Sequence, residues 1–347
     1  MALSIVAALL PVVVFLAILL LMDSFKLVHP RMVVAAIAAG AVAALATLDL
    51  QAVLFPPGTV TFRTLTRYVA PLSEETLKAV FVVFVLRRRR LGFLVDAAIV
   101  GFAVGTGFAL MENADYLLRS ATQGRAASQG VALWFVRGFG PAVLHGATTA
   151  LFAMLAKILT ERHEDRWAAM LLPAWAAAVV MHSLFNHFPL PPILATCVQL
   201  IVLPLVITEV FNRSERATRE WVGEGLDLDV ELLQLITSAQ FGGTRLGAYL
   251  RELRSRFAGP VVADMFCLLR LELELAIRAK GMLMAREAGL EVPLDDGVRA
   301  RLREVDYLRR SIGTAGMLAL RPLRVTTSRD DWNRYLLERA GGGRLKT

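Results

Sequence analysis

Charged and imidazole side chains interrupt strongly apolar sequence at four places in this chain. The first place is Ser73-Glu74-Glu75-Thr76-Leu77-Lys78, which precedes eight apolar residues and then four arginines, Arg87 to Arg90. As a helix, the stretch from Glu74 to Leu86 is about 20 Å long, whereas the hydrocarbon core of a bilayer is about 30 Å thick. If the arginines lie at one membrane face, both glutamates lie inside the membrane. Charged residues there are costly and usually belong to a functional site.

The other three places lie further along the chain, each in its own apolar run. In order, they contain Phe108 and Glu112, then His145, then His182 and Asn186. His182 and Asn186 are four residues apart and therefore share a helix face. Counting about 1.5 Å per helical residue puts Glu112 and His182 in the middle or outer half of the membrane. The same count places His145 deeper in the membrane. It lies at the level of the other residues only if its helix is tilted or begins later than the apolar run.

Helix spacing also relates the charged residues of the first place to one another and to a neighbouring helix. Glu74 and Lys78 are four residues apart and therefore share a helix face. In the apolar run before Glu112, Gly101 and Gly105 form a pattern of small residues that lets a neighbouring helix approach closely. A site built from several membrane helices requires such an approach.

Hydrolysis is the chemistry that these residue types favour. A carboxylate near two imidazoles can hold and deprotonate a water molecule. Two histidines and a carboxylate can instead bind a divalent metal, and both mechanisms remain open. Asn186 is the candidate donor to an oxyanion. Because the site is enclosed by helices in lipid, a peptide bond is the expected target.

Other interpretations of the same residues remain open at this point. A Glu75–Lys78 pair can be a structural clamp inside a bundle, and a single buried His145 can simply bond to a neighbouring helix. Proton- or ion-coupled transporters also place glutamate and histidine near the membrane midplane, although this chain has no two-half symmetry. A catalytically silent membrane scaffold, whose soluble part recruits partners, is the third alternative.

Composition divides the chain into a membrane part and a soluble part. Of the 347 residues 56% are hydrophobic, against about 45–50% for a soluble domain. The last 136 residues nevertheless carry 42 of the 68 charged side chains. We therefore predict a transmembrane protease-like domain over residues 1–211 and a cytoplasmic helical domain of unknown role over residues 212–347. The net charge of +8 is spread over both parts, which argues against nucleic acid as a partner.

The apolar runs predict an all-α fold, a polytopic membrane helix bundle of about seven spans with a C-terminal soluble helical domain. The first run lacks a basic leading segment and is too long for a signal peptide, so it is expected to be retained as a span. The third span is expected to be broken near Pro71. The predicted spans are residues 2–22, 32–48, 62–86, 92–118, 131–159, 167–188 and 193–211.

The distribution of lysine and arginine over the loops predicts the orientation. With seven spans, twelve of these residues lie on one side and five on the other. Arg137 is counted among the five, as a charge of the outer side. The bias predicts an integral, multi-pass protein of the cell membrane with its N-terminus outside and its C-terminal domain in the cytoplasm.

Glu74-Glu75-x-x-Lys78, Phe108-x-x-x-Glu112, His145 and His182-x-x-x-Asn186, in this order on successive spans, resemble the PrsW family of intramembrane proteases. That family is similar to the wider group of CAAX prenyl endopeptidases and bacteriocin-immunity-type membrane proteins. The resemblance covers about residues 67–190, and the C-terminal part carries none of its motifs. The prenyl endopeptidases have a histidine where this chain has Glu112, which leaves the metal question open.

The resemblance also implies roles, a substrate class and a partner. It makes Glu74 the carboxylate that activates water. It leaves open whether Glu112, His145 and His182 bind a divalent metal such as zinc or orient the water directly without a metal. It implies a membrane-anchored protein substrate, such as an anti-sigma factor, cleaved near the outer side of the bilayer. The sequence does not give the oligomeric state. The predicted catalytic residues are Glu74, Glu75, Glu112, His145, His182 and Asn186, with Lys78 and Phe108 in support.

Overall fold

In the computed structural model, the described secondary structure consists of helices. The structure describes residues 2–23, 25, 27–56, 58–123, 131–187, 190–290, 296–320, 322 and 328–340. In these residues every regular element is a helix, which confirms the predicted all-α class. The chain forms two compact units, Met1–Ser214 and Glu215–Thr347.

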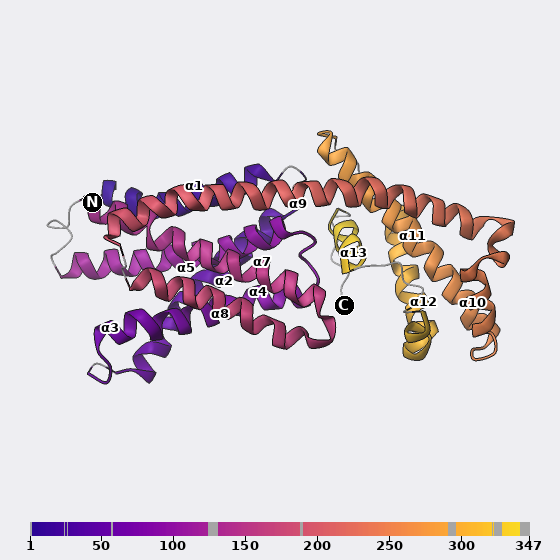
Figure 1. Ribbon diagram of the computed structural model, residues 1–347, viewed down its shortest axis with the longest axis horizontal. Helices are drawn as coiled ribbons and strands as arrows, with labels where there is room; N and C mark the ends of the chain where they lie inside the picture. The colour runs from indigo at the N-terminus through magenta and orange to yellow at the C-terminus, as the bar shows by residue number, and fades with distance from the viewer. Residues whose placement is uncertain are drawn as a thin grey trace. The chain divides into compact units, whose positions relative to one another are not determined.

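The first unit is a bundle of long apolar helices (Figure 1). Its elements are α1 (Ala2–Met22), α2 (Pro30–Leu54), α3 (Phe62–Thr64), the π-helix η1 (Leu65–Val69), α4 (Ala70–Arg87), α5 (Leu94–Thr122), α6 (Val131–Phe139), α7 (Pro141–Arg162), the short 3-10 helix η2 (Glu164–Arg166), α8 (Trp167–Asn186) and the beginning of α9 (Pro192–Thr237). In the described chain, five stretches are long and apolar enough to cross a membrane: α2, α5, Val136–Arg162 (the end of α6 together with α7), α8 and α9.

The other two predicted spans coincide with α1 and α4. The apolar part of α1 over described side chains, Val6–Met22, is shorter than the other five. The α4 helix carries Glu74, Glu75, Lys78 and Arg87 within 18 residues, which lowers its hydropathy. The helix that departs most from ordinary span composition is therefore the one that carries the candidate site.

The α5 helix is the centre of the first unit. It packs against α7 and α2 over most of its length and also touches α1 and α4. In its most apolar stretch 83% of the residues are buried, compared with 6% for α9. The α5 helix is thus shielded by protein on nearly every side, whereas α9 presents most of its apolar surface to the surroundings.

Two of the predicted spans differ from the structure in their course. The predicted span over residues 131–159 is interrupted at Gly140, whose φ of −85° and ψ of −94° are not helical, and Pro141 begins α7. His145 is therefore only the fifth residue of its helix. The depth estimated for His145 from the sequence was too large because it was counted from residue 131, ten residues before this helix begins. The third span is not broken near Pro71, because the helix continues from α3 through the π-helical turn η1 into α4.

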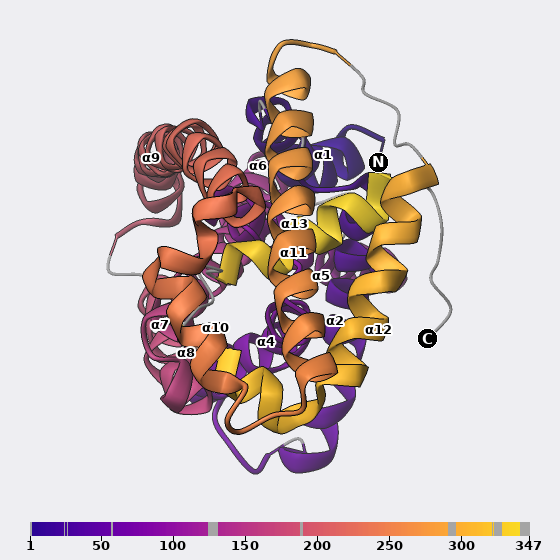
Figure 2. The same cartoon turned by 90° about the vertical axis from the view of Figure 1, so that its right-hand side faces the viewer.

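Among the residues that the structure describes, the second unit consists of the remaining part of α9 and four further helices. These are α10 (Arg245–Leu253), α11 (Gly259–Glu287), α12 (Asp296–Leu320) and α13 (Ser328–Ala340), with the 3-10 turn η3 (Ala239–Gly243) before α10. The α11 helix lies beside α12 and also contacts α13 and α10 (Figure 2). The α12 helix is kinked at Gly313, whose φ of 70° suits glycine. A buried ion pair joins Lys280 of α11 to Asp229 of α9 at 2.7 Å.

Candidate active site

The π-helical turn before α4 fixes the start of the segment that carries the two glutamates. Pro71 has no N–H, so it cannot bond to a carbonyl of the preceding turn. Two side chains of α8 supply donors to this turn. Ser183 Oγ donates to the carbonyl of Arg67 at 2.6 Å, and Asn186 Nδ2 donates to the carbonyl of Thr66 at 2.9 Å. The helix that carries His182 is therefore bonded to the turn that leads into Glu74.

Glu75 is the most densely bonded acidic residue of α4. It is 2% exposed, and its Oε1 accepts hydrogen bonds from Lys78 Nζ at 2.6 Å and from Thr148 Oγ1 at 3.0 Å. The same oxygen lies 2.7 Å from His182 Nδ1. Lys78 is completely buried, and its ammonium also lies 3.2 Å from His145 Nδ1. Lys78 thus pairs with Glu75 rather than with Glu74, although Glu74 is the residue four positions away.

His145 and His182 each bond to a carboxylate through one ring nitrogen. His145 Nε2 lies 2.7 Å from Glu112 Oε2, and His182 Nδ1 lies 2.7 Å from Glu75 Oε1. An ionised carboxylate can only accept, so the proton of each imidazole belongs on the nitrogen that faces it. The lone pair of His145 Nδ1 then accepts from Lys78 Nζ at 3.2 Å, whereas that of His182 Nε2 is left for another partner.

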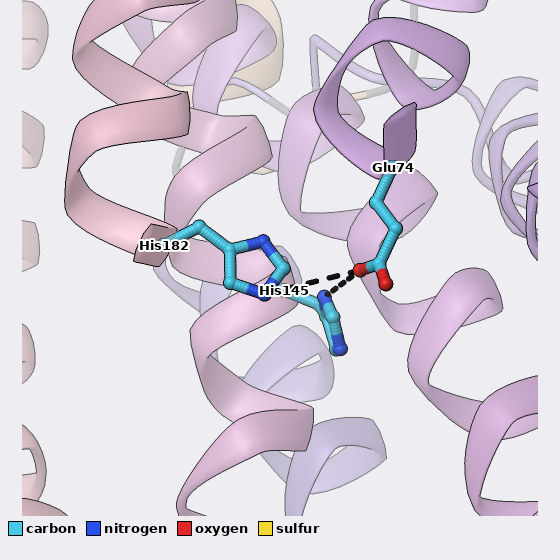
Figure 3. A group of neighbouring side chains, drawn as sticks. All are labelled: Glu74, His145 and His182. Atoms are coloured by element: carbon cyan, nitrogen blue, oxygen red, sulfur yellow. Dashed lines mark ion pairs between the residues drawn. The ribbon is translucent and has the colours of Figure 1, made fainter. Parts of the chain in front are cut away.

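Those two nitrogens converge on Glu74. Glu74 Oε2 lies 3.8 Å from His145 Nδ1 and 3.8 Å from His182 Nε2, as the dashed lines in Figure 3 mark. The two imidazole rings are 5.1 Å apart, edge to face. Glu74 Oε2 is buried and accepts no hydrogen bond from the described residues. Three atoms with lone pairs therefore surround a position that suits a water molecule or a cation.

Arg137 and Asn113 complete the environment of Glu112. Arg137 Nη2 lies 3.1 Å from Glu112 Oε1, and Arg137 Nε donates to Asn113 Oδ1 at 3.3 Å. The guanidinium also stacks on the ring of Tyr116, 3.9 Å from its centroid. The carboxylate of Glu112 is therefore bonded to an imidazole through one oxygen and to a guanidinium through the other.

Close contact between α5 and α7 sets the position of His145. A Cβ added at Gly105 would lie 2.1 Å from the carbonyl oxygen of His145, and one added at Gly101 would lie 2.6 Å from that of Thr149. The two backbones therefore touch, as the spacing of these glycines predicts. The ring of Phe108, also on α5, lies 4.9 Å from the His145 ring. The α5 helix thus supports His145 both through its backbone and through this aromatic ring.

The structure brings together Glu74, Glu75, Lys78, Phe108, Glu112, His145 and His182. The amide of Asn186 is engaged by the carbonyl of Thr66. Sequence reasoning missed two members of the cluster. Thr148 carries a hydroxyl one turn after His145. Arg137 was counted only as a charge of the outer side, because α6 was not separated from the rest of the predicted span over residues 131–159. The Gly140-Pro141 pair is the sequence signal for that separation.

The donor atoms fit a divalent metal, although in a different combination from the predicted one. Glu74, His145 and His182 each offer one ligand atom, and these atoms lie within 4.8 Å of one another. Glu74 thus takes the place that the sequence assigned to Glu112, because Glu112 bonds the opposite nitrogen of His145. Carboxylates behind the histidines, here Glu112 and Glu75, are typical of zinc sites, as is a ligand set of two histidines and one glutamate.

Comparison with known proteins gives one family. A family model described as PrsW family intramembrane metalloprotease matches residues 28–209. The match covers more than half of the chain and includes every predicted site residue. No curated protein and no solved structure matches the chain.

Proposed function

Because the chain belongs to the PrsW family of intramembrane metalloproteases, we propose that it hydrolyses a peptide bond of a membrane-anchored protein with water activated at Glu74. Family membership and the apolar helices make the chain a multi-pass intramembrane protease. The proposed roles of single residues, the substrate and the dependence on a metal go beyond the family.

The unpartnered oxygen of Glu74 carries the proposal. This oxygen and the two imidazole nitrogens nearest to it are all acceptors, since the opposite nitrogen of each ring faces a carboxylate. The ammonium of Lys78 lies 3.2 Å from one of these acceptors, His145 Nδ1, but the buried oxygen of Glu74 still needs a donor or a cation. A water molecule there would donate one hydrogen to Glu74 and the other to a histidine, which is the arrangement that general-base catalysis requires.

The proposed hydrolysis uses Glu74 as base and then as acid. Glu74 takes a proton from the water while the water oxygen bonds to the scissile carbonyl carbon. The resulting tetrahedral intermediate collapses, the C–N bond breaks, and Glu74 returns the proton to the leaving nitrogen. The products are a new carboxylic acid and a new amine, which exchange a proton to become a carboxylate and an ammonium group. Glu75 does not contact the water in this scheme, because its Oε1 holds Lys78, Thr148 and His182.

A metal would occupy the same centre. Glu74, His145 and His182 would hold it, and it would supply Lewis-acid chemistry for peptide hydrolysis. Lys78 Nζ, at 3.2 Å from His145 Nδ1, would then have to leave that nitrogen. Elemental analysis of the purified protein, together with cleavage assays in chelator, separates the two mechanisms. Activity that persists in metal-free protein would support the glutamate mechanism.

The substrate class follows from the surroundings of the site. The site lies among membrane helices, so the scissile bond must reach it from a segment held in or beside the bilayer. The family resemblance suggests an anti-sigma factor or a similar regulator with a single span. Such a substrate, cleaved near the outer side, agrees with the outer position of Glu112 and His145 that the helix order implies.

Comparison of membrane proteomes tests the proposal. A strain with Glu74→Gln should accumulate one full-length single-span protein that wild-type cells cleave. Asp115→Asn is the matched control, since Asp115 is a carboxylate of α5 that forms an ion pair with the exposed Arg119 of the same helix. Identical proteomes in wild type and Glu74→Gln, at equal expression of the protease, would contradict the proposal.

A further inference from the structure

Arg137 faces the candidate site although it lies in the short helix α6. Its side chain is 18% exposed, whereas that of Arg119, on the outer part of α5, is 63% exposed. Arg119 pairs with Asp115 of its own helix, but Arg137 reaches across to α5 and contacts Glu112, Asn113 and Tyr116. An arginine that served only as a topology anchor would not need these contacts.

The backbone around Arg137 is held in place by two other helices, α1 and α9. A Cβ added at Gly138 would lie 1.9 Å from the carbonyl oxygen of Ala7, so α6 touches α1 directly. The carbonyls of Phe139 and Gly140, where α6 ends, accept hydrogen bonds from Gln199 Nε2 at 3.2 and 3.1 Å. The backbone of α6 is therefore held in one place, which fixes where the Arg137 side chain is attached.

The partners of Arg137 are held as well. Asn113 Nδ2 donates to the carbonyl of Ala8 at 2.8 Å, which leaves its oxygen directed at Arg137 Nε. The ring of Tyr116 lies under the guanidinium and packs edge to face on Trp134, a fully buried residue. The planar fork of arginine suits such a combination of a carboxylate, an amide oxygen and an aromatic face, whereas a lysine could satisfy only part of it.

The contacts form a chain from Arg137 to the reacting centre. The guanidinium holds Glu112 Oε1 at 3.1 Å, and Glu112 Oε2 lies 2.7 Å from His145 Nε2. The second nitrogen of that ring, Nδ1, then faces Lys78 Nζ at 3.2 Å and Glu74 Oε2 at 3.8 Å. A carboxylate behind a histidine selects which nitrogen carries the proton and fixes the rotation of the ring. The group that holds the carboxylate thus acts on the imidazole through it.

We propose that Arg137 is a positioning residue that holds Glu112 against His145 and so keeps the Nδ1 lone pair of His145 directed at Glu74. This inference rests on the proposed function for the consequence to catalysis, but the effect on His145 itself can be measured without cleavage. Removing the guanidinium leaves Glu112 without its cationic contact to α6, so the carboxylate can turn away from the ring.

Nitrogen NMR of histidine-labelled protein in lipid tests the proposal. The His145 signal is assigned by its disappearance in His145→Gln. In the full-length wild type it should report the tautomer protonated at Nε2, whereas Arg137→Gln should give a mixture of tautomers. Arg119→Gln, the matched control, should leave the signal unchanged. An unchanged His145 tautomer in Arg137→Gln would overturn the proposal.

Cleavage of the substrate found by the proteome comparison gives the second readout. Arg137→Gln should lower kcat about tenfold and leave KM within about twofold, since groups behind a site histidine typically contribute factors of 10 to 100. Arg137→Lys should restore part of the loss. A raised KM with unchanged kcat would overturn the positioning role and make Arg137 a substrate contact.

Two controls keep the result decisive. If Arg137→Gln does not accumulate in membranes, Tyr116→Leu removes the ring under the guanidinium while keeping every charge, and the same changes in tautomer and kcat are expected. An unchanged tautomer and kcat in Tyr116→Leu would then overturn the proposal. Full cleavage by His145→Gln would contradict the proposed function alone, because the tautomer change in Arg137→Gln does not depend on it.

Discussion

Replacing Gly105 by alanine should displace His145 without altering any polar group of the site. The new Cβ would lie 2.1 Å from the carbonyl oxygen of His145 and 2.6 Å from the Cα of Gly146. An ordinary contact begins near 3.4 Å, so α5 and α7 must separate by about 1.3 Å at this level. Both neighbours are backbone atoms, so no side-chain rotation can relieve the overlap.

The size of the effect follows from that displacement. A misplacement of about 1 Å in a catalytic group can lower a rate about 100-fold. We therefore expect Gly105→Ala to reduce kcat by about two orders of magnitude. Overpacking of this kind also costs about 1–3 kcal/mol of stability, so the variant should unfold at a lower temperature while still reaching the membrane.

Gly107→Ala is the matched control for Gly105→Ala. A Cβ there would lie 1.9 Å from the carbonyl oxygen of Ile37, so the overlap is similar but separates α5 from α2. It should lower stability comparably and affect the rate much less. The assay is the cleavage rate of the accumulated single-span substrate in liposomes, with thermal unfolding measured on the same preparations. Wild-type kcat in Gly105→Ala, or equal losses of kcat in both variants, would refute the reasoning.

Three further outcomes are expected. Asn186→Ala should leave the carbonyl of Thr66 without this donor, which costs about 1–3 kcal/mol of stability, and should change kcat by less than about threefold. A loss of kcat of about 100-fold or more would instead make Asn186 an oxyanion donor. The hydrogen bonds from Arg334 lower the pKa of Asp306, so the pair stabilises the second unit above the pKa of the unfolded carboxyl group, and this stabilisation is lost as the pH falls through the lower folded pKa. Asp306→Asn should therefore cost up to about 1 kcal/mol of stability at pH 7 and nothing in acid. Thermal unfolding at both pH values measures this, and an equal cost in acid would contradict the assignment. In a Cys197→Ala background, exposed Cys267 should react with an impermeant maleimide only after cells are permeabilised, and labelling of intact cells would contradict the predicted cytoplasmic second unit.

The members of the site were predictable because each is a costly residue in an apolar run. Glu74, Glu112, His145 and His182 have no reason to lie in lipid-facing sequence, so their presence on four successive helices indicates a shared interior. The glycines of α5 similarly predicted which helix face would meet a neighbour. These arguments depend only on composition and helical period, which a single sequence contains.

The pairing inside the site was less predictable, because it depends on helix rotation and on breaks in the helices. Lys78 can reach either glutamate of α4, and only the rotation of the helix toward α7 and α8 selects Glu75. A sequence does not say which nitrogen of His145 faces which carboxylate, so it could not predict that Glu74, and not Glu112, would be the candidate metal ligand. Arg137 was counted only as a charge of the outer side, because the helix break at Gly140, which lets α6 turn its arginine toward Glu112, was not predicted.

The comparison of Glu74→Gln with Glu75→Gln tests the central claim most directly. Both changes are isosteric and remove one carboxylate, but only Glu74 has a buried oxygen free to face water. With the identified substrate in liposomes, Glu74→Gln should lower kcat by at least about 100-fold with little change in KM. Glu75→Gln should retain more activity while losing stability. Cleavage at the wild-type rate by Glu74→Gln would contradict the assignment of Glu74 as the group that activates water.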